Sequence, residues 1–144
     1  MEPIIKIDKL SVVYFLGRSN EVRALQNISL EIYPGEFVIF FGPSGCGKST
    51  LLYSIAGLEN STQGNVFISG KNLASLSQKE LEKFHRQEIG MIFQAYYLIN
   101  SLSVIDNVLL PQIFMDARPV ERKKKALELL EHFGVGNQAK KLPN

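Results

Sequence analysis

Hydrophobic and polar positions alternate in several stretches near the N-terminus, and this spacing predicts β-strands. Residues 4–15 (IIKIDKLSVVYF) are rich in β-branched and aromatic side chains with partial alternation, which indicates a strand. Residues 28–32 (ISLEI) alternate strictly, as is typical of a half-buried antiparallel strand, and Pro34 and Gly35 predict the turn that ends it. Residues 65–69 (NVFIS) predict a further short strand, followed by a turn at Gly70.

Two short runs are almost wholly apolar, and this pattern predicts buried strands. Residues 37–41 (FVIFF) have no polar position, which suits a central parallel strand covered on both faces. Residues 89–94 (IGMIFQ) predict a second buried strand. A glycine-rich loop follows the first run, and a helical pattern then extends from Lys48 to Ala56, where Gly57 is expected to end it.

Capping signals predict three further helices. Residues 77–80 (SQKE) fit a capping box, so a helix is expected from there to about Arg86. Residues 103–106 (SVID) could cap another helix, which Pro111 would kink or end. Pro119 suits the start of the last helix, which would end at Gly134. The residues expected to form its apolar face are Ala126, Leu127, Leu130 and Phe133.

Composition narrows the class of protein. The 144 residues fit one domain, and 45% apolar with 21% charged residues is ordinary for a globular chain. The net charge of +2 comes without a face-long basic stripe, so no nucleic-acid partner is expected. The single Cys46 excludes an intramolecular disulfide. Because no apolar stretch reaches about 18 residues and the N-terminus lacks a signal-peptide pattern, we expect a cytoplasmic protein.

Residues 42–49 (GPSGCGKS) match the phosphate-loop pattern G-x-x-x-x-G-K-[ST]. Glycine lets the backbone curve, so that successive N–H groups form a concave nest for phosphate oxygens. The N-terminus of the following helix adds free N–H groups and the positive end of its dipole. Lys48 supplies a charge for the β- and γ-phosphates, and the Ser49 hydroxyl can ligate Mg²⁺. The motif therefore predicts a polyphosphate site.

These segments together resemble the N-terminal part of an ATP-binding cassette (ABC) transporter ATPase, from about residue 4 to residue 144. Beyond GPSGCGKST at 42–50, residues 51–70 are similar to the segment after the Walker A helix of that family. Residues 89–111 are similar to the Q-loop strand and the segment after it, and Tyr14 matches the aromatic residue of the A-loop. The stretch SLSQKELEKFHRQEIGMIFQ resembles the lipoprotein-release and macrolide-export branch.

The resemblance implies roles for individual residues with ATP and Mg²⁺. Tyr14 would stack on the adenine ring. Lys48 and Gln94 would serve catalysis, and Gln94 would reach Mg²⁺ or the attacking water and sense the membrane subunit. Ser49 and Gln94 would be the metal ligands. The residues that would hold the phosphates are Gly42, Ser44, Gly45, Cys46, Gly47, Lys48, Ser49 and Thr50.

The resemblance also implies the architecture and the partners. The expected fold is α/β, a P-loop NTPase-type core with an N-terminal antiparallel β subdomain. Residues 1–94 would form the ATP-binding core and β subdomain, and residues 95–144 the start of the helical subdomain. The expected partners are membrane-spanning transporter subunits and, in the full-length parent, a second nucleotide-binding domain in a homodimer. The protein would then lie at the cytoplasmic face of the membrane through those subunits.

Several of the family's motifs are not found in the 144 residues. These are the signature, the Walker B strand, the catalytic glutamate and the switch histidine, which His85 and His132 do not replace. We therefore expect a nucleotide-binding domain truncated before the signature and Walker B segments. Its full-length parent would hydrolyse ATP to drive transport, whereas the chain alone is predicted to be inactive. Two alternatives stay open: a nucleotide-binding fragment without turnover, and a small P-loop kinase.

Overall fold

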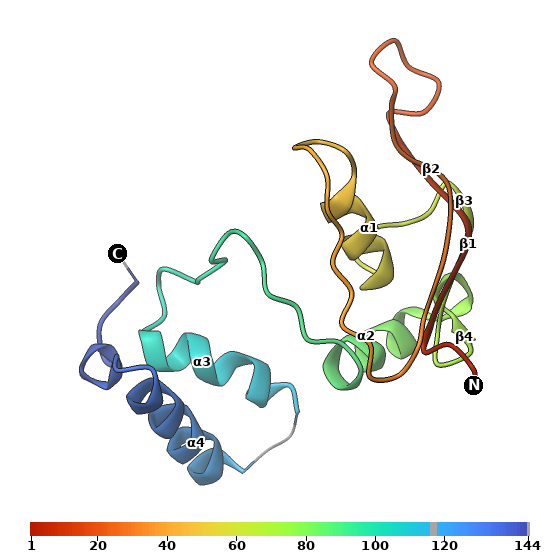
Figure 1. Ribbon diagram of the computed structural model, residues 1–144. Helices are drawn as coiled ribbons and strands as arrows, with labels where there is room; N and C mark the ends of the chain where they lie inside the picture. The colour runs from red at the N-terminus through yellow and green to blue at the C-terminus, as the bar shows by residue number, and fades with distance from the viewer. Residues whose placement is uncertain (116–117, 144) are drawn as a thin grey trace. The chain divides into compact units, whose positions relative to one another are not determined.

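The computed structural model describes residues 1–115 and 118–143, which fall into two compact units, residues 1–89 and residues 90–144. Unit 1 contains β1 (Ile5–Tyr14), β2 (Val22–Ile32), α1 (Lys48–Ile55), β3 (Gln63–Ile68), β4 (Lys71–Asn72), a 3-10 turn (Leu73–Ser75) and α2 (Gln78–Gln87). Unit 2 contains α3 (Val104–Ile113), α4 (Pro119–His132) and a 3-10 turn (Gly136–Gln138), as Figure 1 shows. Among these described residues, no helix is both long and apolar enough to cross a bilayer.

The strands of unit 1 form one antiparallel sheet in the order β2-β1-β3-β4. Tyr14 at the end of β1 pairs with Val22 of β2, and Ile5 at its start pairs with both Ile32 and Ile68. The predictions of strands at 4–15, 28–32 and 65–69 are thereby confirmed, although β2 begins earlier, at Val22. The extra length arises because Val22, Arg23 and Leu25 pair with β1 across a shifted register, whatever the side-chain pattern of this stretch.

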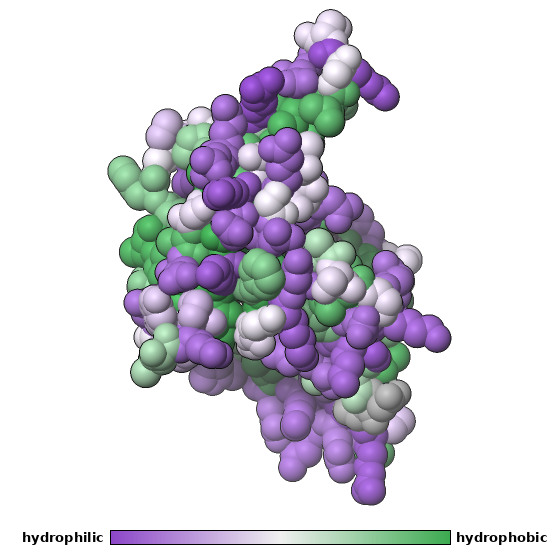
Figure 2. Space-filling model, turned by 90° about the vertical axis from the view of Figure 1, so that its right-hand side faces the viewer, coloured by the Kyte–Doolittle hydropathy of each residue, from purple (hydrophilic) through white to green (hydrophobic). Residues whose placement is uncertain are grey.

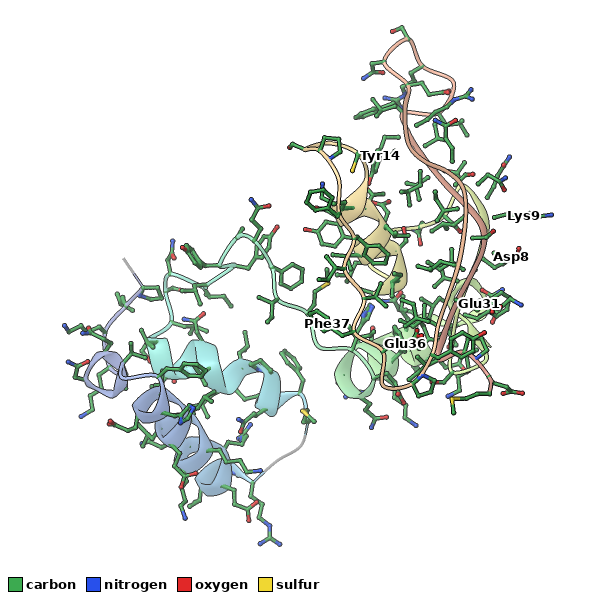
Figure 3. The ribbon with its side chains drawn as sticks, viewed as in Figure 1. Asp8, Lys9, Tyr14, Glu31, Glu36 and Phe37 are labelled. Atoms are coloured by element: carbon green, nitrogen blue, oxygen red, sulfur yellow. The ribbon has the colours of Figure 1, made fainter. Side chains whose placement is uncertain are left out.

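The core of unit 1 lies between α1 and one face of this sheet. Figure 1 shows α1 alongside the strands, and Figure 3 shows Asp8, Lys9 and Glu31 on the side of the sheet away from α1. Figure 2, which views the molecule from the side where β1 to β3 lie, shows polar side chains interspersed with apolar ones. One buried and one solvated face is typical of an antiparallel sheet. The buried cluster consists of Ile7, Leu10, Val12, Leu25, Leu51, Ile55, Val66, Ile68 and Phe84.

A β-bulge in β1 determines which of its side chains reach the core. The pairing shifts between Ile7 and Leu10, and Lys9 at the bulge has a φ of 49°. The extra residue turns the strand, so Ile7 and Leu10 both face the core although they are three positions apart. Gly64 of β3 lies against the bulge, where a Cβ would collide with the carbonyl oxygen of Lys9. Only glycine permits this close approach of β3 to β1.

The helix boundaries follow their local capping signals. In α2 the hydroxyl of Ser77 accepts from the N–H of Glu80, whose carboxylate accepts from the N–H of Ser77, so the predicted capping box is confirmed. The Ser77 hydroxyl also donates to this carboxylate at 2.6 Å, and this hydrogen bond, together with the one from the Ser77 N–H, holds the pKa of Glu80 below its usual value. Ser103 caps α3, and Pro111 lies two residues before the end of that helix. α4 begins at Pro119, as predicted.

The predicted apolar face of α4 is right at two positions and wrong at two. Ala126 and Leu130 are buried, whereas Leu127 is 38% and Phe133 71% exposed. Within unit 2, α3 is the helix that packs on α4. A single neighbouring helix covers a narrow stripe of residues four positions apart, and the flanking apolar residues therefore stay in contact with solvent.

Residues 37–41 and 89–94 do not form the predicted buried strands. Neither segment belongs to the sheet. Phe37, Phe41 and Ile92 are each at least 90% exposed, while only Phe40 and Ile89 of the two segments pack against the core. A strand must pair its backbone N–H and C=O groups, and no strand among residues 1–115 and 118–143 pairs with either segment. The apolar pattern indicates that these residues favour a buried position between paired strands, but the described part of the chain provides no such position.

The central position of β1 predicts that truncating its buried side chains destabilises unit 1. Leu10 is fully buried, so Leu10→Ala should lower the free energy of unfolding by about 2–5 kcal/mol through lost burial and a residual cavity. Leu16→Ala is the matched control, because Leu16 is 63% exposed and its truncation should cost less than about 0.5 kcal/mol. The measurement is urea unfolding followed by circular dichroism. Equal losses for the two variants would contradict this account of the core.

Candidate functional site

The glycine-rich loop lies in unit 1, between residues 37–41, which belong to no helix or strand, and the first turn of α1. Tyr14 lies beside this loop in Figure 3. The end of β1 and the start of α1 are therefore neighbours although they are far apart in the sequence. The predicted phosphate-binding residues of the loop and helix are Gly42, Ser44, Gly45, Cys46, Gly47, Lys48, Ser49 and Thr50.

Lys48 folds back onto the loop that precedes it. Its Nζ donates to the carbonyl oxygens of Gly42 at 2.9 Å and Pro43 at 2.6 Å, and it lies 3.6 Å from the Sγ of Cys46. Within the described residues no acidic side chain forms an ion pair with Lys48. The ammonium group is held by neutral atoms only, so its positive charge is not neutralised at the place where the motif predicts phosphate oxygens.

The first turn of α1 adds backbone donors at the same place. Gly47 is the N-cap residue and has no side chain to cap the helix, and the first turn has no acidic residue. The first helical N–H that donates to Gly47 is that of Leu51, at 2.8 Å. The N–H groups of residues 48–50 therefore carry the partial positive charge of the helix N-terminus. An anion here would meet these groups, the Lys48 ammonium and the exposed hydroxyl of Ser49.

Two glycines of the loop have different structural tasks. Gly45 and Gly47 both adopt positive φ, at 78° and 94°, which bends the loop towards α1. A Cβ at Gly45 would meet nothing within 4 Å, whereas one at Gly47 would lie 2.5 Å from the carbonyl oxygen of Ala24 in β2. Gly45 thus supplies curvature alone, and Gly47 also lets the start of α1 pack directly on the sheet.

Tyr14 is partly buried beside α1. Its hydroxyl donates to Oε2 of Glu59 at 2.8 Å and lies 3.5 Å from Oγ1 of Thr50. Burial raises the pKa of the Tyr14 phenol, and the hydrogen bond to Glu59 also raises it, against an opposite effect from Thr50. The phenol therefore remains a protonated donor at neutral pH. No motif in the sequence marks Glu59, and its contact with Tyr14 was not predicted.

Gln94 belongs to unit 2, where it lies exposed in a bend. The site geometry described above therefore involves residues of unit 1 alone and does not include Gln94. Within residues 1–115 and 118–143, no group of three or more His, Cys, Asp or Glu side chains could hold a metal ion. A divalent ion at the loop would need phosphate oxygens and water besides the Ser49 hydroxyl, which is the hard oxygen set that Mg²⁺ prefers. The loop thus fits Mg²⁺ together with a bound polyphosphate.

Residues 25–144 match the family model described as ABC transporter. An uncharacterized ABC transporter ATP-binding protein of Thermotoga maritima is 38% identical over 144 residues, which are 100% of this chain and 61% of the relative. The macrolide export ATP-binding/permease protein MacB of Wolinella succinogenes is 40% identical over 143 residues, or 99% of this chain and 22% of the relative. The dimeric structure of the ATP-binding cassette MJ0796, in a post-hydrolysis state bound to ADP and phosphate, has a TM-score of 0.87 at 38% identity and covers 97% of this chain.

The glycine-rich loop, the open start of α1 and Lys48 define a P-loop protein. The chain belongs to the ABC transporter family, as part of an ATP-binding domain, and the resemblance drawn from its motifs is confirmed. The chain spans 61% of the length of the Thermotoga relative and 62% of the solved cassette. Membership of this family argues against the alternative of a small P-loop kinase.

The contrast between Gly45 and Gly47 leads to a prediction on stability. Both Gly45→Ala and Gly47→Ala place a Cβ on left-handed backbone, which costs about 1–2 kcal/mol. Gly47→Ala also forces a clash with Ala24, so it should lose about 1–3 kcal/mol more free energy of unfolding than Gly45→Ala. Urea unfolding of the two variants measures the difference. If Gly45→Ala proves as unstable as Gly47→Ala, the packing of the loop on β2 is wrongly described.

Proposed function

We propose that this chain is the ATP-binding part of an ABC transporter ATPase, whose loop at 42–50 holds the triphosphate of ATP. The observation that carries the proposal is the Lys48 ammonium, which lies in the loop without an acidic partner among the described residues, at the open N-terminus of α1. Cation and helix dipole act at one place, so both would stabilise a β- or γ-phosphate there. The glycines and Ser44, Cys46 and Thr50 would line the phosphates.

Tyr14 would provide the platform for the adenine ring. It is aromatic, lies beside the loop and keeps its hydroxyl bound to Glu59. A stacked aromatic contact contributes about 0.5–1.5 kcal/mol beyond the area that it buries. Base and triphosphate would then be bound by opposite ends of one site in unit 1.

Ser49 and Gln94 would be the protein ligands of a Mg²⁺ ion that accompanies the nucleotide. The ion would neutralise charge on the phosphate oxygens during hydrolysis. Ser49 supports this role because its exposed hydroxyl is next to Lys48 on the first turn of α1. Gln94 would contact the ion or the attacking water, and Lys48 with Gln94 would form the catalytic pair of this part of the chain.

In the full-length protein, ATP hydrolysis would power transport or mechanotransmission through membrane-spanning subunits at the cytoplasmic face of the membrane. The names of the relatives support this proposal: MacB of Wolinella succinogenes is an ATP-binding/permease protein for macrolide export. The solved cassette MJ0796 is dimeric, which supports a homodimer of nucleotide-binding domains in the parent. The macrolide-export and lipoprotein-release branch is the one we propose.

Binding of ATP should depend on Lys48. Lys48→Ala removes the charge in the loop and should weaken ATP binding by about 10- to 150-fold, which corresponds to the roughly 1.5–3 kcal/mol of a charge-assisted hydrogen bond. Lys9→Ala is the matched control, because Lys9 lies on the side of the sheet away from α1 in Figure 3. Isothermal titration calorimetry gives both affinities. Equal affinity for the parent chain and Lys48→Ala would show that the phosphate assignment is wrong.

The 144 residues by themselves are proposed to bind ATP without turnover. They supply groups that stabilise charge, but none of their motifs places a carboxylate to orient the attacking water, and such positioning contributes about 10²–10⁴ in rate. Phosphate release at saturating Mg-ATP should therefore equal that of Lys48→Ala. A rate of about 1 per second or more that disappears in Lys48→Ala would contradict this proposal.

A further inference from the structure

The backbone of Glu59 is fixed by the way in which α1 ends. Gly57 has a φ of 68°, and its N–H donates to the carbonyl oxygen of Ser54 at 3.1 Å. The N–H of Leu58 donates to the carbonyl oxygen of Tyr53 at 2.8 Å, which completes a Schellman motif. The N–H of Glu59 also donates to this oxygen, at 3.2 Å. The path of the chain after α1, and with it the backbone position of Glu59, is therefore defined.

The segment after Glu59 is fastened to the end of β1. The hydroxyl of Thr62 accepts from the N–H of Val13 at 2.9 Å, and the N–H of Thr62 donates to the carbonyl oxygen of Ser11 at 2.8 Å. These two bonds flank Val12, two residues before Tyr14. Tyr14 and Glu59 thus extend from two backbone segments that are bonded to each other close to the contact.

The side chains of Tyr14 and Glu59 meet at 2.8 Å, and Glu59 forms no ion pair within residues 1–115 and 118–143. We propose that Glu59 is a positioning residue, whose carboxylate fixes the ring of Tyr14 as the platform for the base of a bound nucleotide. This inference rests on the proposed function, in which Tyr14 stacks on adenine. It assigns Glu59 to base recognition and not to the chemistry of the phosphates.

The Tyr14 hydroxyl also lies 3.5 Å from Oγ1 of Thr50, in the first turn of α1. One group of side chains therefore joins the base platform to the helix that carries Lys48 and Ser49. With the acceptor at residue 59 present, the orientation of the ring is set before the nucleotide binds, and less freedom is lost on binding. Without the acceptor, the ring can turn about its side-chain torsions, and that freedom must be lost when the base stacks.

The test compares ATP with inorganic tripolyphosphate, which has no base. Isothermal titration calorimetry of the chain gives both dissociation constants. The dissociation constant for tripolyphosphate divided by that for ATP is the ratio that measures what the base adds to affinity. Glu59→Ala and Tyr14→Phe should each lower the ratio about three- to tenfold, since each removes one partner of the same hydrogen bond. The double variant should lower it no further than either single change. Glu59→Gln keeps an acceptor and should keep the ratio within about twofold of the parent.

The control variants distinguish a change in the orientation of the Tyr14 ring from the effects of lost charge or lost folding. Glu59→Gln and Glu59→Ala remove the same negative charge, so a purely electrostatic effect on phosphate would appear equally in both variants and with tripolyphosphate. Glu2→Ala, an exposed carboxylate outside the sheet, should leave the ratio unchanged. Tyr14→Phe removes a single oxygen atom and serves as the test variant if Glu59→Ala does not fold.

An unchanged ratio in Tyr14→Phe, or equal losses in Glu59→Gln and Glu59→Ala, overturns the inference. Failure of the parent chain to bind either ligand overturns the proposed function itself, and the inference with it.

Discussion

The packing of α1 on the antiparallel sheet is the contact on which the other features of unit 1 depend. Leu51 and Ile55 of the helix enter the same buried cluster as Leu10 and Leu25 of the sheet, and each such side chain contributes about 1.5–3 kcal/mol when it is removed from water. Because Gly47 lets the start of α1 touch β2, this apolar contact also fixes where the helix N-terminus and Lys48 lie. The position of the phosphate loop therefore depends on hydrophobic burial as well as on its own hydrogen bonds.

The strand β1 connects that core to the base end of the proposed site. Its bulge at Lys9 turns Ile7 and Leu10 towards α1, and five residues beyond the bulge the same strand ends at Tyr14. A one-residue shift in the pairing register of β1 would therefore alter both the side chains that enter the core and the position of the Tyr14 ring. Stability and the proposed nucleotide recognition share one backbone register, although the residues that serve them are different.

Signals that act within a few residues predicted the structure well, and signals that need a distant partner did not. The capping box at Ser77, the start of α4 at Pro119 and the glycine-rich loop follow from local backbone chemistry. The apolar run at 37–41 needs strands on either side to be buried, and the described chain offers none. The contact of Tyr14 with Glu59 joins residues 45 positions apart, and neither residue carries a pattern that reveals the other. The roles of the site residues stay predictions, carried by the family motifs.

The exposed run at 37–41 has a consequence for how the protein behaves in solution. Its five residues include three phenylalanines and no charge, and backbone that is outside the sheet remains able to pair with a neighbouring molecule. The net charge of +2 gives little electrostatic repulsion between copies. Pairing of this segment with a second copy is therefore a route to self-association that leaves both the sheet and the phosphate loop folded.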